Sequence, residues 1–202
     1  MHPNRSFDWA GQADMLAFAA ARGFAHIFVA GDGGLFVAHA PLLVTPAGRI
    51  QFHLARRNRA AGHFPGQAVL ISVSARDGYH SANWYASADQ VPTWHYEAVE
   101  IEGAARAIDE PELVAHLDQL SETMEGRYSP ERPWTRAKMG PGKFEAMVQA
   151  LIGFEVAPTA VRGTRKFNQH KRPADLDATI AGQSGAGRED IVAAIRDVTG
   201  RA

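Results

Sequence analysis

The chain has 202 residues, 46% of them apolar, which is enough to bury one sizeable core. Charged residues make up 21% and the formal net charge is −1, so no global field favours nucleic acid or anionic lipid, and any anion site has to be local. Cysteine is absent, which excludes disulfides, thiolate metal ligands and a cysteine nucleophile. Because the sequence shows neither an apolar signal segment nor an apolar run of membrane-spanning length, we expect a cytoplasmic protein.

The first part of the chain predicts one helix followed by a meander of short strands. Helix formers precede Gly23, which is placed to end the helix. The sequence Gly-Asp-Gly-Gly at 31–34 is a strong hairpin signal, and Pro41 predicts an edge or a bulge in the strand that follows it. The expected elements are a helix at 14–22 and strands at 25–30, 35–44 and 49–54.

The middle of the chain predicts further strands and a capped helix. Gly103 lies within an expected strand and indicates either a bulge or a close backbone approach. Asp109 is placed as the N-cap of a helix, with Glu112 as its capping-box partner. The expected elements are a short helix at 56–64, a strand at 67–75, an aromatic turn region at 78–90, a strand at 94–108 and a helix ending near 124.

The last part predicts a proline-rich loop, one more strand and a helical end. The expected elements are a loop at 125–142, a helix at 143–150, a strand at 152–162 and helices at 174–181 and 188–198 around a glycine-rich linker. Short strands with interspersed helices favour a small barrel over a parallel α/β sheet. We expect one domain over 1–172 and a helical extension over 173–202.

Aromatic side chains are concentrated in one stretch of the sequence. It holds five of the eight Trp and Tyr residues, namely Tyr79, Trp84, Tyr85, Trp94 and Tyr96. Such side chains suit a flat π ligand or a subunit interface, and they equally suit the core and closing loop of a barrel. The residues alone leave these alternatives open.

A second candidate site is the junction between the strand ending at Leu54 and the helix expected near Arg57. Free N–H groups at a helix start, with Arg56 and Asn58 as further donors, would form an anion site of phosphate size. The alternative is a solvated surface turn. No nucleoside triphosphate loop and no dinucleotide fingerprint occurs in the sequence.

Other polar groups give weaker signals. The four histidines in or beside expected strands lack metal-ligand spacing, so no metal site is predicted, and His39 is better interpreted as a hydrogen-bonding group on a pocket-facing strand. No serine lies in a nucleophile elbow, and no catalytic residue is assigned. The basic stretch 162–172 could contact phosphate or DNA, or could be a solvated loop. The four histidines are His39, His53, His80 and His95.

Several collinear segments resemble the PaiB family of FMN-binding negative transcriptional regulators, which belongs to the split-barrel flavoproteins that include pyridoxamine phosphate oxidase. The most specific is Val-Pro-Thr-Trp-His-Tyr at 91–96, which is similar to V-P-T-W-N-Y. The others are residues 1–7 (MHPNRSF), 39–42 (HAPL), 53–58 (HLARRN), 81–85 (SANWY), 152–155 (IGFE) and 166–169 (KFNQ).

The resemblance implies an α+β split β-barrel of antiparallel Greek-key type, with peripheral helices and a C-terminal helical extension. It also implies a homodimer with FMN at the subunit interface. By position, the phosphate and ribityl chain would be held by His53, Leu54, Ala55, Arg56 and Asn58. His39 would line the isoalloxazine, and the neighbouring chain would supply Trp94, Tyr96, Lys166 and Gln169.

The chain departs from the family pattern at several positions, and these change the polarity expected of the pocket. Arg59 and Ala82 each replace a proline, His95 replaces an asparagine, and His170 and Lys171 alter the end of the last segment. We expect an FMN-binding protein acting as a flavin-dependent oxidoreductase or a flavin-sensing regulator. The alternatives are a DNA-binding or protein-binding repressor without catalytic activity, and a flavin reductase or haem-degrading enzyme on the same barrel.

Overall fold

The computed structural model describes residues 2–201, so Met1 and Ala202 lie outside the description. The chain forms two compact units, which we call the large unit (residues 16–73 and 100–161) and the small unit (residues 2–15, 74–99 and 162–201). No helix among the described residues is long and apolar enough to cross a bilayer. The expected boundary at residue 173 stays a prediction.

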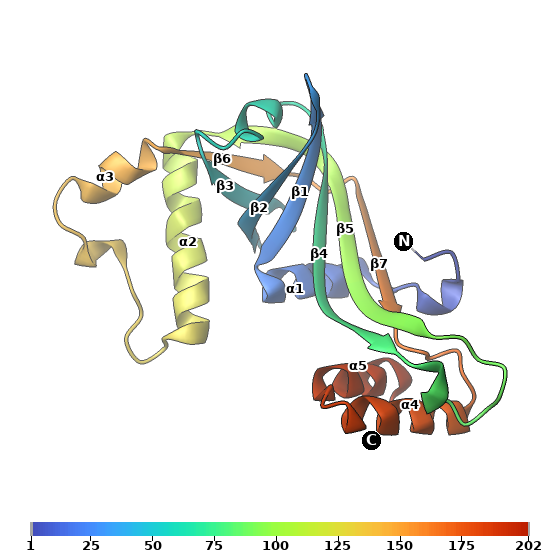
Figure 1. Cartoon of the computed structure of the whole chain (residues 1–202). Helices are drawn as coiled ribbons and strands as arrows, with labels where there is room; N and C mark the ends of the chain where they lie inside the picture. Colours follow the sequence, from blue (N-terminus) through green and yellow to red (C-terminus); the bar gives the residue numbers. More distant parts are fainter. Residues whose placement is uncertain (1, 202) are drawn as a thin grey trace. The chain divides into compact units, whose positions relative to one another are not determined.

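The elements are labelled in Figure 1. The strands are β1 (Phe24–Gly31), β2 (Gly34–Val44), β3 (Ile50–Ala55), β4 (Ala68–His80), β5 (Thr93–Ile108), β6 (Leu151–Val156) and β7 (Ala160–Lys166). The α-helices are α1 (Gln12–Arg22), α2 (Glu110–Tyr128), α3 (Lys143–Val148), α4 (Pro173–Gly185) and α5 (Glu189–Thr199). Short 3₁₀ turns are η1 (Arg5–Phe7), η2 (Ala61–His63), η3 (Ala82–Trp84) and η4 (Arg136–Lys138).

The strands form one sheet in the order β4-β1-β2-β3-β6-β5-β7, and a further pairing of β4 with β5 closes it into a barrel. Neighbouring strands are antiparallel from β4 through β1, β2, β3 and β6 to β5. Strand β2 pairs with β1 as far as Pro41 and with β3 from Leu42 onward, so the proline lies where the strand changes partner. The predicted α+β antiparallel split barrel is confirmed.

The core of the large unit follows from alternation along the strands. In β3, Ile50, Phe52 and Leu54 are buried, whereas the residues between them are not. Phe52 packs against Phe64 and Phe154, with ring centroids 5.4 Å and 5.1 Å away. Full burial of such side chains contributes about 1.5–3 kcal/mol each. The opposite face of β3 is therefore free to position polar groups.

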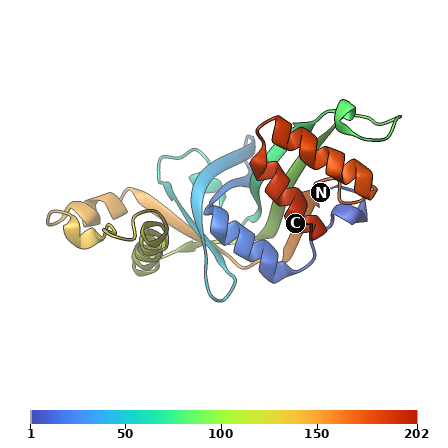
Figure 2. The ribbon, with the colours of Figure 1, turned by 90° about the horizontal axis from the view of Figure 1, so that it is seen from below.

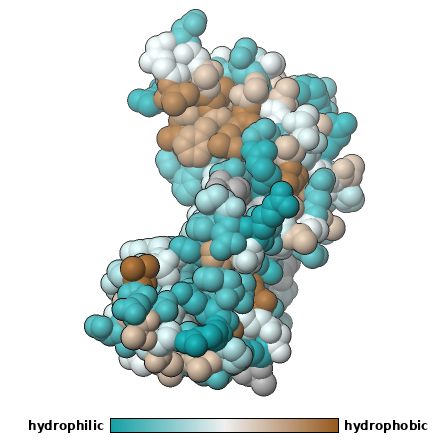
Figure 3. All heavy atoms as spheres, turned by 90° about the vertical axis from the view of Figure 1, so that its right-hand side faces the viewer, coloured by the Kyte–Doolittle hydropathy of each residue, from teal (hydrophilic) through white to brown (hydrophobic). Residues whose placement is uncertain are grey.

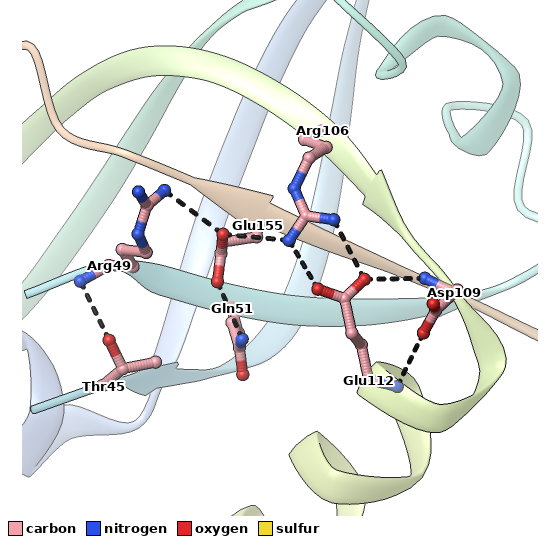
Figure 4. A network of polar contacts seen from close by, with 7 residues as sticks. All are labelled: Thr45, Arg49, Gln51, Arg106, Asp109, Glu112 and Glu155. Atoms are coloured by element: carbon pink, nitrogen blue, oxygen red, sulfur yellow. Dashed lines mark hydrogen bonds and ion pairs between the residues drawn. The ribbon is translucent and has the colours of Figure 1, made fainter. Parts of the chain in front are cut away.

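A polar network fixes the start of α2 against the strands of the large unit (Figure 4). The buried carboxylate of Glu155 on β6 accepts hydrogen bonds from Arg49 (3.2 Å), Gln51 (3.0 Å) and Arg106 (3.1 Å). Arg106 also binds both oxygens of Glu112, at 2.9 Å and 2.8 Å, and together with the Asp109 N–H it lowers the pKa of Glu112 to about 2. The predicted capping box of Asp109 and Glu112 is confirmed.

The small unit has its own core. Helices α4 and α5 lie side by side in Figures 1 and 2. They bury an apolar cluster consisting of Phe167, Leu176, Ile191, Ala194 and Ile195.

Several sequence predictions on secondary structure are wrong. Residues 56–64 form turns and the 3₁₀ turn η2 rather than a helix, because the polar run after Ala55 folds back on itself. The single strand expected at 152–162 is two strands, β6 and β7, separated at 157–159. The expected linker at 182–187 is helical as far as Gly185.

The close backbone approach predicted at Gly103 is confirmed and gives a stability prediction. A Cβ atom there would lie 2.5 Å from the Ala157 carbonyl oxygen, whereas one at Gly126 in α2 would meet nothing within 4 Å. We expect Gly103→Ala to lower the free energy of unfolding by about 1–3 kcal/mol. Gly126→Ala should raise it by up to about 1 kcal/mol, because alanine is the better helix former. Urea denaturation of both variants checks this, and equal effects would contradict the packing assigned to Gly103.

Candidate functional site

The segment that follows β3 is a compact turn. The Asn58 N–H donates to the Ala55 carbonyl oxygen (2.8 Å), and the Ala61 N–H donates to that of Asn58 (3.0 Å). The Asn58 side-chain oxygen accepts the Ala60 N–H (2.9 Å). The helix start that was expected to offer free N–H groups is therefore absent, and guanidinium groups are the main cationic donors at this turn.

A cavity of about 550 Å³ lies beside this turn. It is lined by Ala55, Arg56, Arg57, Ala146, Gln149 and Ala150. Arg56 is anchored there, because its Nε donates to the Gln149 carbonyl oxygen (2.9 Å) and its N–H to that of Ala150 (2.8 Å). Neither Arg56 nor Arg57 has a carboxylate partner among residues 2–201. Two uncompensated guanidinium groups at a cavity fit a doubly charged phosphate.

His39 lies on the outward face of β2, in register with His26 on β1. The two rings meet edge to face, with centroids 4.9 Å apart, and the His39 side chain is exposed. His39 therefore lies on an exposed strand face, and its expected role as a hydrogen-bonding group on a pocket-facing strand stays a prediction. Its contact with a flavin ring stays a prediction.

Apolar side chains surround these histidines on the outward face of β1, β2 and β4. Phe28 pairs across the sheet with Val37 on β2 and Leu70 on β4. Phe24 is 44% exposed, Phe28 41% and Leu35 81%. An open groove of about 710 Å³ runs along Phe28, Leu35 and Leu70. Figure 3 shows apolar side chains gathered at the height of the upper parts of β1, β4 and β5 in Figure 1. We call the outward surface of β1, β2 and β4 around Phe24, Phe28 and Leu35 the uncovered sheet face.

His53 points to the other side of the sheet from the core. Its Nδ1 lies 3.0 Å from Nε2 of His116 on α2, and the ring lines a cavity different from the one beside Arg56. Burial lowers the pKa of both imidazoles, that of His116 to about 4. The neighbouring Leu54 side chain faces the core. A phosphate contact by His53 or Leu54 stays a prediction, to which Leu54 could contribute only backbone atoms.

The residues expected to reach a flavin from a neighbouring chain lie in the small unit. Trp94 is 51% exposed, and its indole N–H donates to Asp77 (2.9 Å). Lys166 Nζ donates to the Thr93 hydroxyl (2.6 Å), and burial lowers the pKa of this lysine. Tyr96 is half-buried.

The Gln169 amide is already occupied by the backbone of the small unit. Its oxygen accepts the Phe167 N–H (2.8 Å), and its nitrogen donates to the carbonyl oxygens of Ser6 and Arg165. Trp94 and Lys166 are therefore better placed than Gln169 to contact another molecule.

Part of the aromatic stretch packs inside the small unit around a buried polar cluster that the sequence did not predict. The His80 and His95 rings are fully buried and stacked, with centroids 5.0 Å apart. Burial lowers the pKa of His80 to about 4 and that of His95 to about 3, so both are neutral at pH 7. Trp84 and Tyr85 contact His80 edge to face, at 5.3 Å and 4.6 Å. Tyr79 and Trp94 stay on the surface.

His116 is a further site residue that the sequence analysis missed. It is 2% exposed on the same face of α2 as Leu113 and Leu120. The spacing of these three residues, at i, i+3 and i+7, is that of a core-facing stripe. A polar residue on such a stripe signals a buried partner, and this signal was available in the sequence.

Comparisons with known proteins show the family and the fold of this chain. Residues 1–160 match the family model described as "Putative FMN-binding domain". The chain is 28% identical over 107 residues to the protease synthase and sporulation protein PAI 2 of Bacillus subtilis (strain 168). That alignment covers 53% of this chain and 50% of the relative, so the chain spans about half the length of the curated relative that it matches.

Two solved structures share the fold. The flavocytochrome Anf3 of Azotobacter vinelandii aligns with a TM-score of 0.61 and 19% identity, over 82% of this chain and 72% of that one. The FAD and haem binding protein of Mycobacterium smegmatis aligns with a TM-score of 0.60 and 16% identity, over 86% and 78%. The family model covers well over half of the sequence, and the predicted PaiB-like resemblance is confirmed. The chain therefore belongs to the family of FMN-binding domains.

Proposed function

We propose that this chain is a homodimeric flavoprotein that holds the FMN phosphate at Arg56 and Arg57, with the isoalloxazine ring against the uncovered sheet face near His39. The observation that carries this proposal is the pair of guanidinium groups beside a cavity, with no carboxylate partner among the described residues. Phosphate is the group that such a donor pair binds best. Asn58 would add its side-chain N–H groups, because only its oxygen is used in the turn.

The uncovered sheet face supports a second copy of the chain as the partner. Contiguous exposed apolar side chains on a soluble domain mark an interaction surface. Phe24, Phe28 and Leu35 form such a surface beside His26 and His39. A second copy that covers it would bury the apolar groups and enclose a ring-shaped ligand. The partner's small unit would then bring Trp94 and Lys166 to the flavin, with Tyr96 behind them.

FMN supplies the redox chemistry when it is bound, and the protein supplies its position and surroundings. We propose that this chain's own residues bind the phosphate, shield the ring from water and hold a neutral hydrogen-bonding surface around it. The proposal does not require a protein acid, base or nucleophile. A flavin-dependent oxidoreductase and a flavin-sensing regulator are both compatible with these roles.

DNA binding has less support. The basic side chains of residues 162–172 are largely engaged within the small unit. Arg165 lies over the Trp9 ring, at 3.5 Å from its centroid, Arg172 pairs with Asp175, and Lys171 Nζ donates to Gln90 (2.7 Å). Helices α4 and α5 carry more acidic than basic residues. A phosphate backbone would meet few available cations on these elements.

The phosphate assignment predicts a difference between two ligands. Replacing Arg56 and Arg57 together by alanine should weaken FMN binding by roughly tenfold to a hundredfold, because charge-assisted contacts to phosphate are lost. Riboflavin lacks the phosphate, so its affinity should change by less than about threefold. Quenching of flavin fluorescence measures both dissociation constants.

Arg59→Ala is the matched control. Arg59 is in the same segment, but its guanidinium lies over the Phe36 ring, at 5.3 Å from the centroid. This variant should bind FMN like the wild type. Equal weakening of FMN and riboflavin by the double variant would contradict a phosphate site at Arg56 and Arg57.

The dimer proposal predicts that a charge on the uncovered sheet face separates the subunits. Phe28→Glu should convert a wild-type dimer into a monomer, because a buried unpaired carboxylate is strongly unfavourable. Tyr128→Glu is the control, since Tyr128 is 76% exposed at the end of α2 and is not one of the outward residues of β1, β2 and β4. Sedimentation velocity gives the masses. A wild-type monomer at micromolar concentration, or a Phe28→Glu dimer, would refute the assignment of this face.

A further inference from the structure

A second cavity of the large unit lies on the helical side of the sheet and plays no part in the proposed flavin site. Its volume is about 360 Å³, and its walls come from β3, α2, α3, the start of β6 and the segment 129–142. Most of the lining is apolar and adaptable, with Trp134 and Phe144 supplying flat surfaces and Met139 and Met147 supplying flexible thioethers. Pockets of this size and composition bind small molecules.

The segment that covers this cavity is fixed in place. The Trp134 N–H donates to Glu125 on α2 (2.7 Å). Arg136 pairs with Asp118 (3.3 Å) and lies over the Phe144 ring, at 5.2 Å from its centroid. The carboxylate that lines the cavity, Asp118, is thus already compensated by Arg136. The cavity therefore carries little net charge at its polar end.

The imidazole pair sets the hydrogen-bonding character of the cavity wall. Nε2 of His116 faces Nδ1 of His53 at 3.0 Å, and Nδ1 of His116 is buried without a partner among the described residues. A buried N–H without an acceptor costs more than a bare nitrogen lone pair. The proton between the rings therefore belongs to His116 Nε2. His53 then accepts at Nδ1 and carries its own proton on Nε2.

The Nε2–H group of His53 is consequently a donor without an acceptor among the residues that the structure describes. The ring lines the cavity, and among residues 2–201 its hydrogen bond to His116 is the one that the structure shows. Both imidazoles are neutral at pH 7, because burial lowers the pKa of each. Neutral donors at His53 and Ser121, apolar walls and a compensated carboxylate together favour an uncharged ligand over an ion.

We propose that this cavity is a binding site for a small, neutral, flat aromatic molecule that carries a carbonyl-type hydrogen-bond acceptor, which His53 Nε2–H would contact. Trp134 and Phe144 would contact the ring faces. The cavity holds about two fused rings, since a pocket of about 150 Å³ accepts benzene. Binding at this cavity does not require FMN. A negative result for this cavity would therefore leave the proposed flavin site intact, and the reverse also holds.

Equilibrium dialysis with 2-acetylnaphthalene as the probe tests this proposal. The FMN-loaded protein and the flavin-free protein should both bind one molecule per chain with a micromolar dissociation constant. 2-Ethylnaphthalene has nearly the same shape but no acceptor, and it should bind about threefold to tenfold more weakly, the value of one neutral hydrogen bond. His53→Phe should abolish that preference. Equal affinities of the two probes for the wild type would overturn the donor role of His53.

A substitution that fills the cavity with a larger side chain is the second test. Ser121 lines the cavity on α2, and Ser121→Trp should weaken the probe at least tenfold. Ala115→Trp is the matched control on the exposed face of the same helix and should bind normally. If Ser121→Trp does not fold, Met147→Trp on α3 replaces it, because Met147 is 55% exposed and tolerates a larger side chain. No saturable binding, equal losses in both tryptophan variants, or displacement of the probe by FMN would refute the site.

Discussion

The two-residue alternation of the β-strands is the constraint on which the rest of the large unit depends. Each strand that buries one set of side chains must present the other set on the opposite face. In β3, burial of Phe52 and Leu54 leaves Gln51 and His53 facing away from the core. In β1, burial of Ile27 leaves His26 and Phe28 outward. The elements that cover these outward side chains decide where ligands and partners can bind.

The outward residues of β3 and β6 are covered by other elements, unlike the outward residues of β1 and β2. Those of β3 and β6 are covered by α2 from the same chain, and the ion pairs around Glu155 hold that helix at its first turn. His53 and His116 pair with each other on this side, and the segment 129–142 partly covers the cavity there. The outward residues of β1 and β2 remain open, and apolar side chains surround His26 and His39 there. A second copy of the chain, with FMN between, is the proposed cover for that side.

The sequence predicted most strands correctly because alternation and turn residues are local signals. The capping box at Asp109 and the hairpin at 31–34 were predicted for the same reason. The helix expected after Ala55 is absent, because the Asn58 side chain closes a turn that propensity cannot reveal. Arg56 and Arg57 come together with α3 only through tertiary packing. The pairing of His53 with His116 joins residues 63 positions apart, and neither side chain alone indicates the other.

The central claim is that two chains build each flavin site. The most direct test is to measure FMN binding by a dimer of two different variant chains. One chain carries Arg56→Ala and Arg57→Ala, and the other carries Trp94→Ala and Lys166→Ala. Each variant as a homodimer should bind FMN at least about tenfold more weakly than the wild type. A co-expressed, doubly tagged heterodimer contains one fully intact site if the sites are shared, and it should bind one FMN with wild-type affinity. A heterodimer with no high-affinity FMN would contradict the account.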